Sequence, residues 1–171
     1  MFNICTTNSA RDVEILADLA ARTFKTAYEG KLRGDALNSF VASAFSREKV
    51  REEMNDPACI FLLAEEDGQA IGYAMLREIE PPTSVIGRSP VELARIYLDD
   101  KAIGRGCGAA LMQACLKSAG KSGNETIWLG VWEENDRAIR FYQQWGFTVV
   151  GSQTFDFGGE KQTDQVMMRS V

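Results

Sequence analysis

Three glycines, Gly104, Gly106 and Gly108, lie at alternate positions between an apolar stretch and a pattern typical of a helix. The preceding stretch VELARIYL is rich in residues that favour strands, and the apolar residues after the glycines recur at helical spacing. Where a strand turns into a helix, the first backbone N–H groups of the helix lack intrahelical partners and carry the positive end of its dipole. Glycines put no side chain between those N–H groups and an anion, so the segment 91–110 predicts a binding site for the diphosphate of a cofactor.

The same glycines allow two other interpretations. The stretch from Gly104 to Ala109 also fits G-x-G-x-x-G/A, the fingerprint of dinucleotide-binding proteins, and a turn of this kind can serve packing alone. The dinucleotide motif normally follows the first strand of a parallel series, and an acidic residue ends a strand about 20 residues further on. Here a hairpin is expected before the glycines, and Glu125 stands at the start of its strand. The nicotinamide interpretation is therefore disfavoured.

The overall composition is that of an ordinary globular protein, with 171 residues of which 45% are hydrophobic and 25% charged. This length predicts one domain, 1–171, with a substantial core. The net charge is −5 and Lys and Arg form no cluster, which disfavours nucleic acid as a partner and favours a cationic small molecule. The first residues carry no basic-then-apolar signal and no apolar run reaches about 20 residues, so we expect no membrane association and a cytoplasmic location.

The chain contains no histidine, and its four cysteines have no C-x-x-C spacing. The absence of His excludes Ser-His-Asp and Cys-His catalysis and His-bearing zinc sites, so any proton transfer must use Glu, Asp, Tyr, Lys, Cys or water. The cysteines favour reduced, mostly buried thiols over a disulfide framework. Cys107 could differ from the other cysteines, because a thiol near a helix N-terminus can have a lowered pKa.

Hydrophobic periodicity predicts strands and helices in a defined order. Strands are expected at 2–6, 59–65, 69–79, 91–98, 126–132, 147–155 and 163–169, and helices at 9–24, 35–45, 46–55, 111–122 and 137–145. Ser9, Ser46 and Asn135 are expected as N-caps, and the step Asp67-Gly68 predicts a hairpin. The segment 81–90 is expected to be a connector, with the rim of a site as the alternative, and FDFGGEKQ is expected to join the last two strands.

This order of elements, together with two motifs, resembles the GCN5-related N-acetyltransferase (GNAT) family over essentially the whole chain. The family's acetyl-CoA motif Q/R-x-x-G-x-G/A lies over residues 103–108. Its downstream pattern N-x-x-A-x-x-x-Y-x-x-x-G-F is complete here, as Asn135, Ala138, Tyr142, Gly146 and Phe147. The resemblance implies an α/β fold: a mixed, mostly antiparallel central sheet with one parallel strand pair at its centre, flanked by helices.

The resemblance also implies acetyl-CoA as co-substrate, with no metal. The residues that it implies for cofactor binding are Ile96, Tyr97, Leu98, Ile103, Gly104, Arg105, Gly106, Cys107, Gly108, Ala109, Asn135 and Tyr142. Ile103 departs from the family, because it stands where Gln or Arg is usual. Arg105 and the backbone N–H groups that follow it are therefore expected to carry more of the diphosphate binding.

Two residues are expected, by the same resemblance, to move protons. Tyr142 matches the family's general acid, which protonates the departing thiolate; the alternative is an aromatic residue on the core face of a helix. Glu92 resembles the glutamate that many members use as a base through a water molecule; the alternative is an exposed or paired structural carboxylate.

Within the family, the stretches FKTAYEGKL, ELARIYLDD and FDFGGEKQTDQVMMRS resemble spermine/spermidine acetyltransferases of the PaiA type. This implies a polyamine or a similar small amine as acceptor, and the carboxylates expected near its cleft are Glu78, Glu80, Glu92 and Glu133. The alternatives are acetylation of a peptide or protein N-terminus or of an amino acid, a CoA-binding regulatory module with little turnover, and a structural partner in a larger assembly. The sequence leaves the oligomeric state open, with a homodimer as one option.

Overall fold

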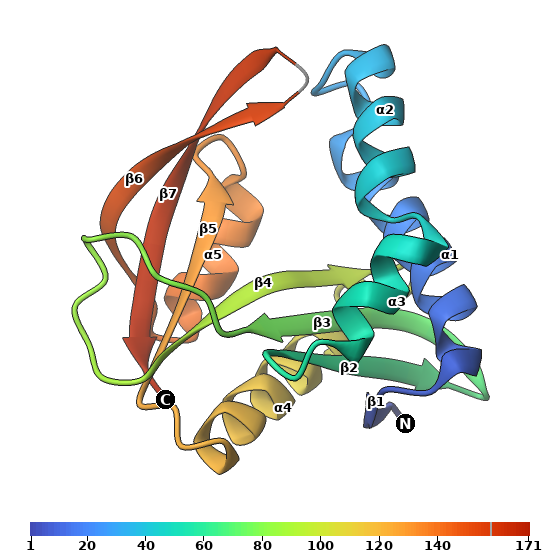
Figure 1. Ribbon diagram of the computed structural model, residues 1–171, viewed down its shortest axis with the longest axis horizontal. Coiled ribbons are helices and arrows are strands. Elements are labelled where there is room, and N and C mark those ends of the chain that lie inside the picture. Colours follow the sequence, from blue (N-terminus) through green and yellow to red (C-terminus); the bar gives the residue numbers. More distant parts are fainter. Residues whose placement is uncertain (158) are drawn as a thin grey trace.

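The centre of the computed structural model, which describes residues 1–157 and 159–171, is a seven-stranded sheet (Figure 1). In these ranges the strand order is β1-β2-β3-β4-β5-β7-β6; β4 and β5 are parallel and the other neighbours antiparallel. The strands are β1 Asn3–Thr7, β2 Cys59–Glu66, β3 Gln69–Arg77, β4 Pro90–Leu98, β5 Thr126–Trp132, β6 Thr148–Phe157 and β7 Glu160–Ser170. The expected mixed α/β architecture is confirmed.

Four of the helices begin within one residue of the predicted positions, whereas the helix after the glycines begins at Cys107, four residues before the predicted start at residue 111. The helices are α1 Ala10–Tyr28, α2 Gly34–Ala44, α3 Arg47–Asn55, α4 Cys107–Lys121 and α5 Asp136–Gln144, with a short 3-10 helix at Asp100–Ala102. The side-chain oxygens of Ser9, Ser46 and Asn135 each accept a hydrogen bond from a backbone N–H of the following first turn, as expected of N-caps. Within the described ranges, none of these helices is long and apolar enough to cross a membrane.

Alternate residues of β2 and β3 point to opposite faces of the sheet and enter two separate cores. Phe61 and Tyr73 pack on the face covered by α1, α2 and α3. Leu62 and Ala74 pack on the other face, with α4 and α5. Figure 1 shows α4 and the α1–α3 group on different sides of these strands. Apolar residues on both faces place β2 and β3 in the interior of the sheet.

The middle of β4 is irregular, and this irregularity opens the sheet. Met75 pairs with Arg95 and Leu76 with Leu93, which leaves Ala94 as an extra residue in β4. The parallel pairing of β4 with β5 covers only Pro90 to Glu92, opposite Thr126 to Trp128. Beyond that point the two strands diverge, and Figure 1 shows β5, β6 and β7 running at a steep angle to β2, β3 and β4. The sequence predicts the parallel pair but not this divergence.

Two elements are longer than expected. Helix α1 continues past residue 24 to Tyr28, because this extra turn packs Tyr28 against Phe24 and Trp132. The prediction that FDFGGEKQ is a connection is wrong for most of its length, since Phe155 pairs with Gln162 and Phe157 with Glu160 in the β6–β7 ladder. Gly158, within that stretch, lies outside the described residues.

The segment 81–89 packs against the sheet as a connector. Val85 is buried in a small core with Trp128 of β5 and Val166 of β7. A Cβ placed on Gly151 would lie 2.5 Å from Ser84 Oγ, so this segment approaches β6 closely. Its packing agrees with the connector interpretation rather than with the rim of a site.

Candidate active site

The glycine segment forms the N-terminus of α4. Gly106 is the N-cap residue with a φ of 88°, and Gly104 has a φ of 77°, both in the left-handed region that favours glycine. Gly106 has no side chain that could cap the helix, so the first N–H groups of α4 are left for a ligand. Gly104, Gly106, Gly108 and Ala109 line a cleft of about 640 Å³.

The cofactor cleft, as we call this cavity, brings together most of the residues that the resemblance implies for cofactor binding. Those among its lining are Ile96, Tyr97, Leu98, Ile103, Gly104, Gly106, Gly108, Ala109, Asn135 and Tyr142. They come from the end of β4, the start of α4 and helix α5. Beyond Glu92, β4 has no pairing with β5 in the described ranges, so this edge of β4 offers free backbone groups to a ligand.

Two of the expected cofactor-binding side chains lie elsewhere. Both terminal nitrogens of Arg105 donate to the Glu66 carboxylate, each at 2.8 Å, and Arg105 is not among the cleft-lining residues. Cys107 is fully buried. Burial raises the pKa of the Cys107 thiol, so the lowered pKa considered for this position is not found.

The cleft also contains basic residues that the sequence reasoning missed. Arg137, in the first turn of α5, and Lys31, just after α1, both line it. Arg137 follows the capping Asn135 by two residues, and this closeness to the motif is the signal that could have found it. Because Arg137 and the glycines lie on different helices, only the tertiary structure brings them into one cleft.

Tyr142 lies on α5, is 9% exposed and lines the cofactor cleft. Its ring packs against Phe141 and Phe147. Burial first, and then the nearby Tyr28 and Cys115, raise the pKa of the Tyr142 phenol, which is therefore protonated at neutral pH. The residue is thus both part of the core and part of the cleft lining.

A second cavity, of about 330 Å³, lies on the face of the sheet that carries α1 and α2. Eight of its 17 lining residues are aromatic: Phe24, Tyr28, Phe40, Phe45, Tyr97, Trp132, Phe155 and Phe157. Figure 1 shows the end of the β6–β7 hairpin beside α2, and Phe40 of α2 contacts Phe155 of β6. We call this cavity the aromatic pocket.

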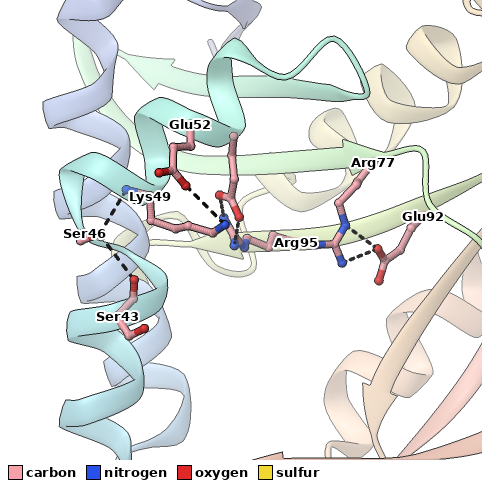
Figure 2. Close-up of polar contacts among 8 residues, drawn as sticks. Ser43, Ser46, Lys49, Glu52, Arg77, Glu92 and Arg95 are labelled. Atoms are coloured by element: carbon pink, nitrogen blue, oxygen red, sulfur yellow. Dashed lines mark hydrogen bonds and ion pairs between the residues drawn. The ribbon is translucent and has the colours of Figure 1, made fainter.

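The polar groups at one end of the aromatic pocket form two ion pairs (Figure 2). Arg77 Nε and Nη2 donate to Glu92 Oε2 at 2.9 and 2.7 Å. Beside them, Arg95 binds both oxygens of Glu53 at 2.7 and 2.8 Å. Glu92 lines the aromatic pocket rather than the cofactor cleft. Of the four carboxylates expected near the acceptor, Glu78, Glu80 and Glu133 are not among the pocket's described lining.

A carboxylate that the sequence reasoning missed, Asp164, also lines the aromatic pocket. It lies on β7, opposite Trp132 of β5 and Gln153 of β6. Burial raises the pKa of the Asp164 carboxyl, and the nearby Glu133 raises it further, whereas a hydrogen bond with Gln153 lowers it. The only sequence signal for Asp164 was its place in a strand with alternating polar residues.

The two cavities meet where β4 and β5 diverge. Both are lined by Tyr28, Ala94, Arg95, Tyr97, Gly130 and Trp132. Burial raises the pKa of the Tyr97 phenol well above its ordinary value, and the phenols of Tyr28 and Tyr142 add to this rise. Tyr142 and Tyr28 thus lie close enough to Tyr97 to raise the pKa of its phenol. A molecule in each cavity would have its end at this junction.

Comparison with known proteins agrees with this geometry. The sequence model described as "Acetyltransferase (GNAT) family" matches residues 24–147. An uncharacterised N-acetyltransferase of Mycobacterium tuberculosis is 37% identical over 160 residues, which cover 94% of this chain and 98% of the relative. A spermidine N(1)-acetyltransferase of Thermoplasma acidophilum is 27% identical over 157 residues, 90% of this chain and 92% of the relative.

A solved structure of similar fold is that of the PaiA N-acetyltransferase from Thermoplasma acidophilum in complex with coenzyme A. It has a TM-score of 0.79 and 25% sequence identity, and the match covers 99% of each chain. The chain belongs to the acetyltransferase (GNAT) family. The expected enzyme class, an acetyl-CoA-dependent N-acetyltransferase, is thereby confirmed.

Proposed function

We propose that this protein transfers the acetyl group of acetyl-CoA to a primary amine, with polyamines and similar small amines as the first acceptor class to test. The observation that carries the proposal is the junction of the two cavities at Tyr97 and Gly130. One cavity has a helix N-terminus suited to an anion, and the other has carboxylates suited to an amine. Co-substrate and acceptor that entered from the two sides would meet between β4 and β5.

The groups along the cofactor cleft fit the chemical parts of CoA. The uncapped N–H groups at the start of α4 suit a diphosphate, and the unpaired edge of β4 suits the amides of the pantetheine arm. Arg137 also lines the cleft, and its positive charge compensates for the apolar side chain of Ile103. The guanidinium of Arg105, held by Glu66, is not needed for this binding.

The acceptor must lose a proton before it can attack. A primary ammonium with a pKa of about 10.4 is only about 0.04% neutral at pH 7, which costs roughly 4–5 kcal/mol. Glu92 is a candidate base, through a water molecule, for one of the two protons that the nitrogen loses in the reaction. Because Arg77 donates only to Oε2, the Oε1 atom is left to hold that water. The ion pair with Arg77 keeps the carboxylate in place.

The departing CoA thiolate must gain a proton, and we assign this step to Tyr142. A general acid must be protonated before it acts, and burial keeps this phenol protonated. Its place in the lining of the cofactor cleft supports the assignment.

The preference for polyamines is supported by the resemblance to the spermidine acetyltransferase of Thermoplasma acidophilum. The aromatic pocket adds walls that can stack on an ammonium or an aliphatic chain. Amino acids and peptide N-termini carry the same nucleophile, so they stay in the test as competing acceptors.

A thiol-release assay tests the proposal. Acetyl-CoA is mixed with the protein and with spermidine, spermine, amino acids, 2-phenylethylamine or short peptides. We expect acceptor-dependent release of CoA, with the highest kcat/KM for a polyamine or similar small amine. Tight binding of acetyl-CoA without release for any acceptor would favour the regulatory module instead, and no binding of acetyl-CoA would favour a structural partner.

A further inference from the structure

Asp164 differs in its partners from Glu92, the other carboxylate in the described lining of the aromatic pocket. Glu92 is paired with Arg77, and Arg95, which also lines the pocket, is paired with Glu53. In the described part of the chain, Asp164 forms no ion pair. Its nearest recorded polar neighbours are Gln153, Glu133 and the phenol of Tyr28. The negative charge of Asp164 is therefore free for a cation that enters the pocket.

Asp164 can occupy its position because the neighbouring residue on β5, Gly130, has no side chain. A Cβ placed on Gly130 would lie 3.3 Å from Asp164 Oδ2 and 2.7 Å from Gln153 Nε2. The carboxylate and the amide thus reach over Gly130, into the space that a side chain of β5 would fill. Since Gly130 lines both cavities, Asp164 Oδ2 stands close to the opening between them.

Aromatic rings surround the same place. Trp132 is the neighbour of Asp164 across the β5–β7 ladder, and Tyr28 lies 6.2 Å from Trp132 between ring centroids. An ammonium held between aromatic faces and a carboxylate gains from both, and the exclusion of water strengthens the attraction. This combination fits an amine rather than an anion or a neutral sugar.

We propose that Asp164 is the residue that binds the ammonium of the acceptor and takes its first proton. This inference rests on the proposed function, and it adds the residue that selects a charged amine over a neutral nucleophile. It also separates two carboxylate roles, because Glu92 then serves the second proton through its water.

The proposed step balances as follows. Asp164 takes one proton from R–NH3⁺, and the neutral amine forms the C–N bond to the thioester carbon. The C–S bond then breaks, and the thiolate takes a proton from Tyr142. The nitrogen loses its second proton to the water held by Glu92. The products are the acetamide and CoA thiol, with one proton released to solvent overall.

Burial of Asp164 suits this role. Burial raises the pKa of the carboxyl, which makes its anion a stronger base than an exposed aspartate. The groups that face it are Glu133 and Trp132 on the β5 side, Gln153 on β6 and Tyr28 on α1, with the paired Glu92, Arg77 and Arg95 across the pocket. Of these groups, Glu133 raises the pKa of Asp164 further and the hydrogen bond with Gln153 lowers it.

The dependence of kcat/KM on pH tests the proposal. The wild-type protein must bind an ammonium with ionised Asp164, so its kcat/KM for the best amine of the panel should be flat from about pH 7 to about pH 9. In Asp164→Asn only the neutral amine can react, so kcat/KM should rise about tenfold per pH unit towards the pKa of the amine. At pH 7 the variant should be at least about 100-fold below wild type, and the two should converge at high pH.

Controls distinguish this role from a structural one. Glu125→Gln removes one exposed negative charge at the far end of β5 and should keep the flat profile. Asp164→Asn should bind acetyl-CoA with an unchanged Kd and keep its Tm, and Asp164→Ala serves if the Asn variant does not fold. Glu92→Gln should keep the flat profile as well, at a lower kcat.

Four results would reject the proposal. A flat profile in both Asp164 variants, or a wild-type profile that itself rises tenfold per pH unit, would show that Asp164 takes no proton. A rising profile in Glu92→Gln, with a flat one in Asp164→Asn, would give the first proton to Glu92. Failure of the wild-type protein to acetylate any amine would instead reject the proposed function, and this inference with it.

Discussion

Arg77 donates from Nε and Nη2 to a single oxygen of Glu92, at 2.9 and 2.7 Å, across the β3–β4 ladder (Figure 2). The Glu92 side chain is 12% exposed, so the pair is largely shielded from solvent. A carboxylate held in this way has one oxygen committed to its partner and one left over. The alternative of a paired structural carboxylate and the proposed role as a base are therefore compatible in Glu92.

We expect Glu92→Gln to lower kcat by about 10-fold to 100-fold, because an amide can hold the water but cannot take its proton. The Kd of acetyl-CoA should not change, since Glu92 does not line the cofactor cleft. Initial-rate assays at saturating concentrations of acetyl-CoA and acceptor measure kcat, and Glu125→Gln is the control for the loss of a negative charge. An unchanged kcat, with chemistry shown to be rate-limiting, would leave Glu92 with the pairing role alone.

Tyr142→Phe should lower kcat by about 10²- to 10⁴-fold without weakening acetyl-CoA binding, because only the proton for the thiolate is lost. Since burial raises the pKa of Tyr142, the loss should be similar at every pH between about 6 and 9 rather than confined to an alkaline limb.

Tyr73→Phe is the matched control for Tyr142→Phe. Tyr73 is also buried, lines neither cavity, and its hydroxyl has no hydrogen-bond partner in the described residues. Its removal should leave kcat unchanged and raise stability by up to about 1 kcal/mol, because an unpaired buried hydroxyl is costly. Equal losses of kcat in the two variants would show that Tyr142 contributes to packing and does not act as the general acid.

Ile103→Arg should tighten acetyl-CoA binding by about tenfold, equal to about 1.4 kcal/mol, if a side-chain cation at this position reaches the diphosphate. Isothermal titration measures the Kd, and Ile103→Leu controls for the change in packing. No gain in a folded Ile103→Arg variant would show that the N–H groups of α4 and Arg137 suffice.

Acetyl-CoA should raise the Tm. A ligand that binds only the folded state at about 100 times its Kd stabilises it by about 2.7 kcal/mol, or about 5–10 °C for a protein of this size. NADH at the same concentration should have no effect, because its binding would need the dinucleotide geometry that the antiparallel β2–β3 hairpin excludes. Equal shifts with both ligands would contradict the assignment of the glycine segment.

The sequence by itself determined the local features of this protein. The N-caps at Ser9, Ser46 and Asn135, the hairpin at Asp67-Gly68, and the strand-to-helix step at Gly106 all depend on residues within one or two turns of each other. Interactions of this range are encoded by residue type and spacing, so periodicity and motifs find them. The motif around Tyr142 was visible for the same reason.

The tertiary structure alone decided which side chains face the acceptor. Asp164 lies beside Gly130 only because β7 inserts between β5 and β6, and Glu92 meets Arg77 only through the register of β3 with β4. The divergence of β4 from β5 depends on an extra residue at Ala94 that no local pattern marks. Contacts between residues far apart in the chain follow from how the strands pair, and pairing and register are decided by the packing of the whole sheet.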